Sequence, residues 1–109
     1  MTYLKINDTK TPATFRGYTK DKDWGDRESK AITVEMTYEE AMETFVDDLE
    51  WAILYTETDS EGVVTTEVYD NSEFSVAGPV TDNRDGTVTV KMGKLAAEEA
   101  LKILTGGLT

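Results

Sequence analysis

The chain has 109 residues, of which 39% are hydrophobic and 30% charged, and this composition predicts one globular domain over residues 1–109. It contains no histidine and no cysteine, which excludes Ser–His–Asp and Cys–His catalysis, disulfides and the usual zinc sites within this chain. The formal net charge of −11 argues against binding nucleic acid directly through its phosphates. No apolar run is long enough to span a bilayer and the first residues do not resemble a signal peptide, so we expect no membrane association.

Three strands are predicted before residue 37, because apolar and polar residues alternate there. They cover residues 2–7, 12–20 and 30–36. Pro12 is expected at the first position of the second strand, where a missing amide is tolerated. The third strand has the clearest alternation, and its core-facing side carries Ile32, Val34 and Met36.

A helix is predicted to begin after Thr37, since Thr37 and Glu40 have the spacing of a capping box. Its apolar residues recur with helical spacing and predict one buried stripe. The stripe consists of Tyr38, Ala41, Met42 and Phe45.

Four more strands follow the helix, paired by turn signals into the hairpins 51–58/63–69 and 74–80/87–92. Both faces of residues 51–58 are largely apolar, which predicts the central strand of the sheet. A second helix is predicted over residues 95–104, ended by Gly106 and Gly107. The short connections require antiparallel neighbours, so we expect an α+β fold. Its sheet would be mostly antiparallel, with about seven short strands, curved or barrel-like, and two short helices.

No catalytic, metal-binding or cofactor-binding residues are expected. Aligning Gly86 with the glycine of an EF-hand loop leaves Met92 where a bidentate glutamate is required. No glycine-rich phosphate loop precedes a helix. We therefore expect a protein that is not an enzyme, although 22 acidic residues leave a carboxylate-pair enzyme as a minor hypothesis.

Residues 20–30, KDKDWGDRESK, place a tryptophan in the most charged segment of the chain. One interpretation is that Trp24 folds back over the sheet as a lid. The other is that Trp24 and Arg27, flanked by Asp23 and Asp26, form a partner-binding anchor, since tryptophan and arginine are enriched in binding hot spots. Both interpretations stay open at the level of sequence.

Three stretches carry a resemblance: MTYLKIND, KDWGDRESKAITVEMTYEEAMETFVDDLEW and YDNSEFSVAGPVTDNRDGTVTVKMGK. Together they resemble small uncharacterised proteins encoded in prophages of Gram-positive gut bacteria, over residues 1 to about 94. The last segment, KLAAEEALKILTGGL, fits that pattern only loosely. The resemblance implies a phage structural role, tail- or baseplate-associated, and a location in the host cytoplasm or the virion.

The leading hypothesis is a non-enzymatic phage or prophage assembly protein that acts through protein–protein contacts. Its expected partners are copies of itself or phage structural proteins, without direct contact to nucleic acid or membrane. The alternative is an acidic, DNA-mimic-like inhibitor or regulator, encoded by a mobile element, that binds a basic host protein surface.

Overall fold

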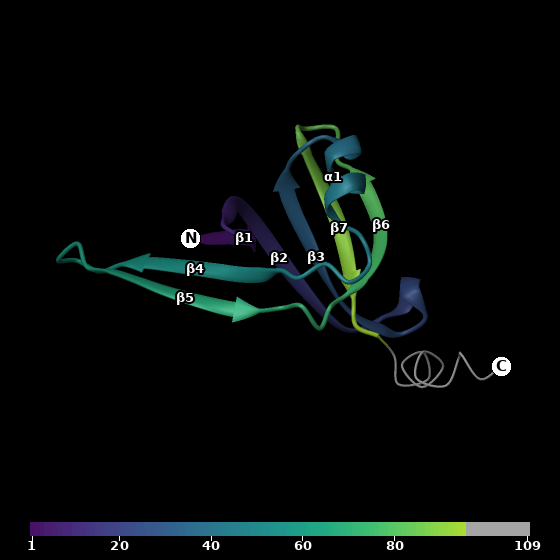
Figure 1. Ribbon diagram of the computed structural model, residues 1–109, viewed down its shortest axis with the longest axis horizontal. Helices are drawn as coiled ribbons and strands as arrows, with labels where there is room; N and C mark the ends of the chain where they lie inside the picture. Colours follow the sequence, from purple (N-terminus) through teal and green to yellow (C-terminus); the bar gives the residue numbers. More distant parts are fainter. Residues whose placement is uncertain (96–109) are drawn as a thin grey trace.

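The computed structural model describes residues 1–95, which form one strongly curved sheet with a short helix packed across it (Figure 1). The sheet has seven strands, and a 3-10 turn, η1, interrupts the chain between the second and the third. In chain order the elements are β1 (Thr2–Ile6), β2 (Thr9–Asp21), η1 (Lys22–Trp24), β3 (Arg27–Glu35), α1 (Tyr38–Thr44), β4 (Ala52–Thr58), β5 (Val64–Asp70), β6 (Val76–Asp82) and β7 (Thr87–Gly93).

The strand order is β5-β4-β1-β2-β3-β7-β6, and every neighbouring pair is antiparallel. The mostly antiparallel sheet and both predicted hairpins are therefore confirmed. Of the two expected shapes, curved or barrel-like, the sheet has the curved one, and the barrel-like one is wrong because β5 and β6 form the two ends of an open sheet. Closure would require these two edge strands to pair with each other, but within residues 1–95 β5 pairs with β4 alone and β6 with β7 alone.

The curvature of the sheet centres on β2, which is 13 residues long. Residues 9–12 of this strand pair with β1, whereas the residues from Ala13 onward pair with β3. Pro12 thus lies inside the strand rather than at its start, as the last residue opposite β1. This position is compatible with proline because β2 exchanges one neighbour for the other there.

The concave face of the sheet holds the core. Leu4, Ile32 and Val34 are almost completely buried, as the alternation of β1 and β3 predicts. The inward residues of β7, which are Val88, Val90 and Met92, are equally buried. The core is completed by Trp51 and Phe74, which lie outside the strands.

The first predicted helix is confirmed with its cap. The Thr37 hydroxyl accepts a hydrogen bond from the Glu40 amide, and the Glu40 carboxylate accepts one from the Thr37 amide. Only half of the predicted stripe is buried: Ala41 and Phe45 enter the core, whereas Tyr38 and Met42 are exposed. A helix of seven residues covers only part of β6 and β7, so its outer apolar side chains have no neighbour among residues 1–95 to bury them.

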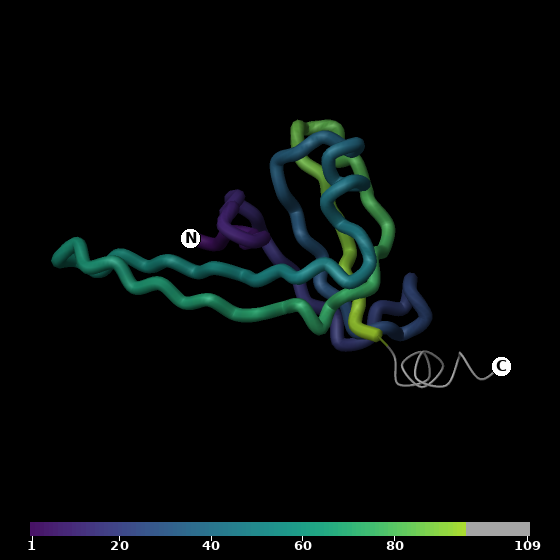
Figure 2. Tube along the Cα trace, in the orientation of Figure 1, coloured from purple at the N-terminus to yellow at the C-terminus, as the bar shows by residue number. Residues whose placement is uncertain are grey.

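Two further predictions concern residues 51–58 and the second helix. Residues 51–58 do not form the central strand, because β1 lies between β4 and the middle of the sheet. The apolar pattern arises because Leu54 and Ile53 pack where β4 leaves the body, while the rest of the strand projects from it (Figure 2). The second predicted helix falls mainly on residues 96–109, outside the described part of the chain. No helix in residues 1–95 has the length and hydrophobicity needed to cross a bilayer.

Candidate partner-binding sites

The charged segment of residues 20–30 is a tight corner between two long strands. The predicted strands end at residue 20 and begin again at residue 30, whereas β2 runs to Asp21 and β3 begins at Arg27. Asp21 caps η1 by accepting a hydrogen bond from the Asp23 amide at 3.1 Å. Gly25 and Asp26 then adopt left-handed conformations, and the Asp26 amide donates to the Asp21 carbonyl at 2.8 Å. The corner therefore has a defined backbone that presents its side chains in fixed directions.

Trp24 packs on the sheet of its own chain. Its indole lies against Gly78 of β6 and Gly93 of β7, so closely that a Cβ added at Gly78 would stand 2.5 Å from the indole Cη2. The Arg27 guanidinium lies over the Trp24 ring, with its Cζ 4.9 Å from the centre of the ring. Arg27 also donates to the Lys94 carbonyl at 3.0 Å. The indole therefore covers Gly78 and Gly93 as a lid, and Arg27 packs against its ring.

The corner is tied to the sheet by a buried carboxylate. Asp21 is 3% exposed, and its carboxylate receives the Lys91 ammonium at 2.7 Å and the Ser29 hydroxyl at 3.2 Å. The hydrogen bond from Lys91 is the main reason why the pKa of Asp21 lies below its usual value. The same contact raises the pKa of Lys91. The alternation of apolar and polar residues does not predict the strand ends at this corner, because the inward-facing residues there, Asp21 and Ser29, are polar.

A pH-dependent contribution to stability follows from this pair. Because the pKa of Asp21 is lowered by folding, its stabilisation is present above the ordinary carboxyl pKa of 3.8 and is lost as the pH falls below that value. Asp21→Asn should therefore lower the unfolding free energy at neutral pH and flatten its decline between about pH 4 and pH 2. Urea unfolding at several pH values measures this. The exposed Asp23→Asn is the matched control, and an equal effect of both variants would contradict the assignment.

The four predicted contact residues are thus divided by the structure. Trp24 and Arg27 are brought together, half-buried against β6 and β7. Asp23 and Asp26 are exposed, and the contacts they make within the corner run through their backbone amides. Any partner that meets this corner would contact the two carboxylates and the outer edge of the lid.

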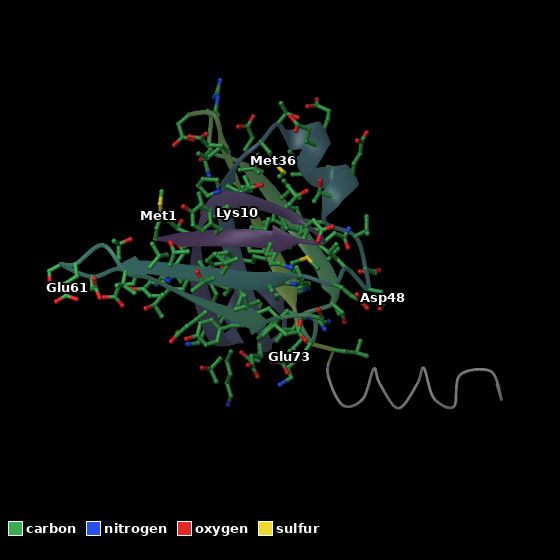
Figure 3. All side chains as sticks on the ribbon, turned by 60° about the vertical axis from the view of Figure 1, so that its left-hand side comes forward. Met1, Lys10, Met36, Asp48, Glu61 and Glu73 are labelled. Atoms are coloured by element: carbon green, nitrogen blue, oxygen red, sulfur yellow. The ribbon has the colours of Figure 1, made fainter. Side chains whose placement is uncertain are left out.

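A second surface, which the sequence reasoning did not propose as a site, is the β4–β5 hairpin. It projects well beyond the rest of the sheet, with Glu61 at its tip (Figure 3). The tip is ordered by Asp59, whose carboxylate accepts from the amides of Glu61 at 2.8 Å and Val63 at 2.9 Å. Gly62 supplies the left-handed conformation of the turn. These bonds fix the conformation of the turn at the tip of the hairpin.

The hairpin is also anchored at its base. The side chain of Asn71, which is 2% exposed, accepts a hydrogen bond from Lys30 of β3 and donates to the Tyr69 carbonyl at 3.0 Å. The backbone amide of Asn71 donates to the Trp51 carbonyl at 2.9 Å. The direction in which the hairpin leaves the body is therefore set by buried contacts rather than by its own strands.

The outer strand of the hairpin, β5, is exposed to solvent, although it carries apolar side chains that would suit a core. Every residue of β5 is exposed, including Val64 at 59%, Val68 at 54% and Tyr69 at 52%. Val63, just before the strand, is 57% exposed. The sequence signal was available in VVTTEVY, but only its position at the sheet edge separates an exposed strand from a buried one.

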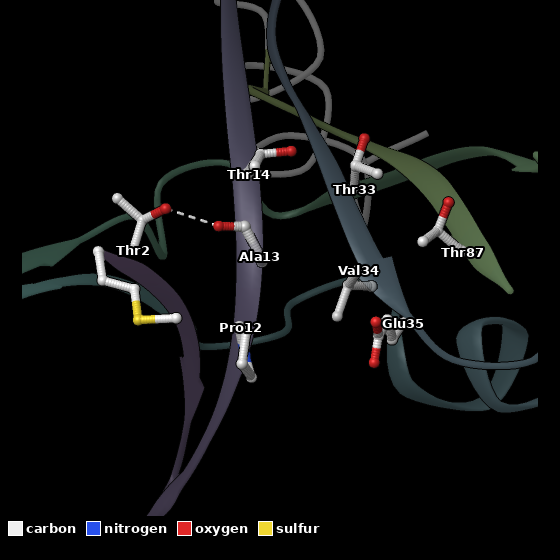
Figure 4. Close-up of a pocket in the computed structure, with 9 residues that line it drawn as sticks. Thr2, Pro12, Ala13, Thr14, Thr33, Val34, Glu35 and Thr87 are labelled. Atoms are coloured by element: carbon white, nitrogen blue, oxygen red, sulfur yellow. Dashed lines mark hydrogen bonds between the residues drawn. The ribbon is translucent and has the colours of Figure 1, made fainter. Parts of the chain in front are cut away.

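One hollow of the described surface lies among the first three strands. It opens where β1 and β3 diverge on either side of β2 and measures about 480 Å³ (Figure 4). Four of its nine lining residues are threonines, and Glu35 is the sole ionisable side chain among them all. Elsewhere in residues 1–95, no group of three or more acidic side chains is placed to hold a metal ion.

Comparison with known proteins gives no match: no protein-family model fits the chain, and no curated protein or solved structure is significantly similar to it. The resemblance to prophage proteins therefore stays a prediction.

Proposed function

We propose that this protein is a non-enzymatic assembly component, of the phage or prophage structural kind, that acts through protein–protein contacts. The observation that carries the proposal is the projecting β4–β5 hairpin, whose outer side exposes Val63 and Val64 near the tip and Val68 and Tyr69 near the base. Exposed apolar side chains gathered on a projecting element are typical of interaction surfaces. An unpaired strand at the edge of a sheet adds backbone groups ready to pair with another protein.

The rest of the molecule supports a role in binding. The corner at residues 20–30 uses Asp21 and Arg27 to hold the Trp24 ring in place, and the hollow beside β2 has one ionisable side chain among its lining residues. A second exposed apolar cluster lies on and just after α1, formed by Tyr38, Met42 and Val46. Two separate contact surfaces are what a subunit needs in order to join neighbours on both sides.

The proposal is tested in a host that carries the gene within an inducible prophage. After induction, we expect the chain to co-sediment with purified particles and deletion of its gene to lower the particle yield. Val64→Lys combined with Val68→Lys should remove the chain from the particles, because lysines replace the apolar contacts of β5. Ser60→Lys at the exposed tip is the matched control and should remain incorporated.

Two outcomes would contradict an assembly role. One is a chain absent from wild-type particles together with an unchanged yield in the deletion strain. The other is specific capture of a basic host protein whose binding weakens steeply with salt, which would favour the acidic inhibitor or regulator instead.

A further inference from the structure

The free edge of β5 is open along its whole length. Within residues 1–95, β5 pairs with β4 alone and forms one end of the strand order. No other described segment runs along its outer side (Figure 2). The opposite edge of the sheet is protected: β6 carries Pro79 and a register irregularity between Ala77 and Val80, and its Ala77 amide already donates to the Asp47 carboxylate at 2.8 Å.

The direction of the backbone groups of β5 follows from its pairing with β4. Asp59 donates its amide to the Val63 carbonyl, and Asn71 donates its amide to the Trp51 carbonyl. These two pairs have the same register as the β4–β5 pairing, so the odd-numbered residues of β5 form hydrogen-bonded pairs with residues of β4. Because such pairs alternate with non-hydrogen-bonded ones, the N–H and C=O groups of Val64, Thr66 and Val68 point toward the free edge.

The side chains of this strand are arranged symmetrically about Thr66. Val64 and Val68 lie two residues before and after it, on the same face of the strand. On the other face, Thr65 is matched by Glu67, and Val63 by Tyr69. An antiparallel copy of the strand centred on Thr66 would therefore place valine opposite valine and each glutamate opposite a threonine.

We propose that β5 pairs in antiparallel fashion with β5 of a second copy of this chain, about a two-fold axis at Thr66. The outward groups of Val64, Thr66 and Val68 then meet the same groups of the second copy and complete the ladder. Val68 extends the cross-strand pair that it already makes with Leu54, so that three apolar side chains in a row, Leu54, Val68 and Val64 of the second copy, cross the new interface. The inference rests on the proposed function, because it names the partner of the hairpin.

Neighbouring registers are less favourable. A two-fold axis at Glu67 would bring two glutamates face to face and Val64 opposite Asp70, and like charges in direct opposition destabilise a sheet. An axis at Thr65 would place Val68 opposite Gly62, which offers no side chain to contact. The carboxylate of Glu67 receives the Tyr69 hydroxyl of its own strand, so it remains satisfied in the pairing about Thr66.

Cysteine crosslinking of the full chain tests the register without background, because the natural chain has no cysteine. Thr66→Cys places the two introduced thiols on residues with Cα atoms about 5.5 Å apart, within the range of roughly 4.4–6.8 Å that a disulfide needs. Ser60→Cys at the exposed tip is the control, with its two copies about 40 Å apart at roughly 3.3 Å per residue. We expect Thr66→Cys to form a covalent dimer under mild oxidation and Ser60→Cys to remain largely monomeric.

Charge exchange at the two valines provides the second test, read as mass in solution by light scattering. Wild-type protein should approach twice the monomer mass as its concentration rises, more readily at high salt, because two chains of net charge −11 repel. Val64→Lys with Val68→Lys should remain monomeric although its net charge is less negative. Val64→Lys with Val68→Glu should dimerise again, since each lysine faces a glutamate of the second copy, and this dimer should weaken with salt.

A wild-type monomer at all concentrations, with equal crosslinking of Thr66→Cys and Ser60→Cys, would overturn the self-pairing. Failure of Val64→Lys with Val68→Glu to recover the dimer would overturn the register. Incorporation into particles is measured separately, so a monomeric chain that still enters particles would leave the assembly role intact and assign the hairpin to another protein.

Discussion

Trp51→Ala should cause the largest single loss of stability in this protein, about 3–5 kcal/mol. Trp51 is 2% exposed, and its ring stacks on Phe15 with 6.2 Å between centroids. Its indole N–H donates to the Phe74 carbonyl at 3.0 Å, which links the start of β4 to the segment before β6. Since domains of this size are stable by only about 5–15 kcal/mol, much of the folded population would be lost.

Urea unfolding followed by circular dichroism measures this effect, and Trp51→Phe separates its two causes. The phenylalanine variant keeps an aromatic ring but leaves the Phe74 carbonyl without its donor, so we expect a smaller loss of about 1–3 kcal/mol. Tyr38→Ala is the control, because this aromatic side chain is 44% exposed and should cost less than about 1 kcal/mol. A loss for Trp51→Ala no greater than that of Tyr38→Ala would contradict its place in the core.

Gly78→Ala and Gly93→Ala should each destabilise the fold by about 1–3 kcal/mol, because the added methyl groups enter the space of the Trp24 ring. The two variants differ in what else they meet. At Gly93 the other close neighbour is the flexible Arg27 side chain, with its Cδ 2.4 Å from the added Cβ. At Gly78 it is the Lys91 carbonyl oxygen at 2.8 Å, which belongs to the backbone of β7.

A double-mutant cycle with Trp24→Ala tests whether the Trp24 ring packs on these two glycines. Removing the half-buried indole should itself cost about 2 kcal/mol, less than the loss of a fully buried tryptophan. In that background the cost of Gly93→Ala should largely disappear, whereas Gly78→Ala should stay destabilising because the carbonyl clash remains. Gly17→Ala is the control, since a Cβ there meets nothing within 4 Å. Additive costs for Trp24→Ala and Gly93→Ala would show that the indole does not lie on this glycine.

The structure shows where the Trp24 ring lies. Its ring covers β6 and β7 of its own chain, so the lid interpretation describes where the ring lies. A role of the corner in partner binding stays a prediction, carried by the exposed Asp23 and Asp26 and by the outer side of the ring. The hairpin is the stronger candidate surface, because its apolar side chains are exposed and its edge is unpaired among the described residues.

The amino-acid sequence by itself determined the local structure of this protein. Alternation placed Ile32 and Val34 inward, the capping box of Thr37 and Glu40 began α1, and the turn residues set both hairpins. These features depend on neighbours within a few positions in the chain, so a periodic pattern or a short motif contains all the information needed.

Only the tertiary structure decided which strands form the edges and which apolar residues remain exposed. Val64 and Val68 have the same local pattern as core residues, yet they are exposed because β5 is the edge strand of the sheet. The Trp24 lid depends on Gly78 and Gly93, more than 50 residues away, and the burial of Asp21 depends on Lys91. Such contacts arise from strand order, which the periodicity of any one strand does not encode.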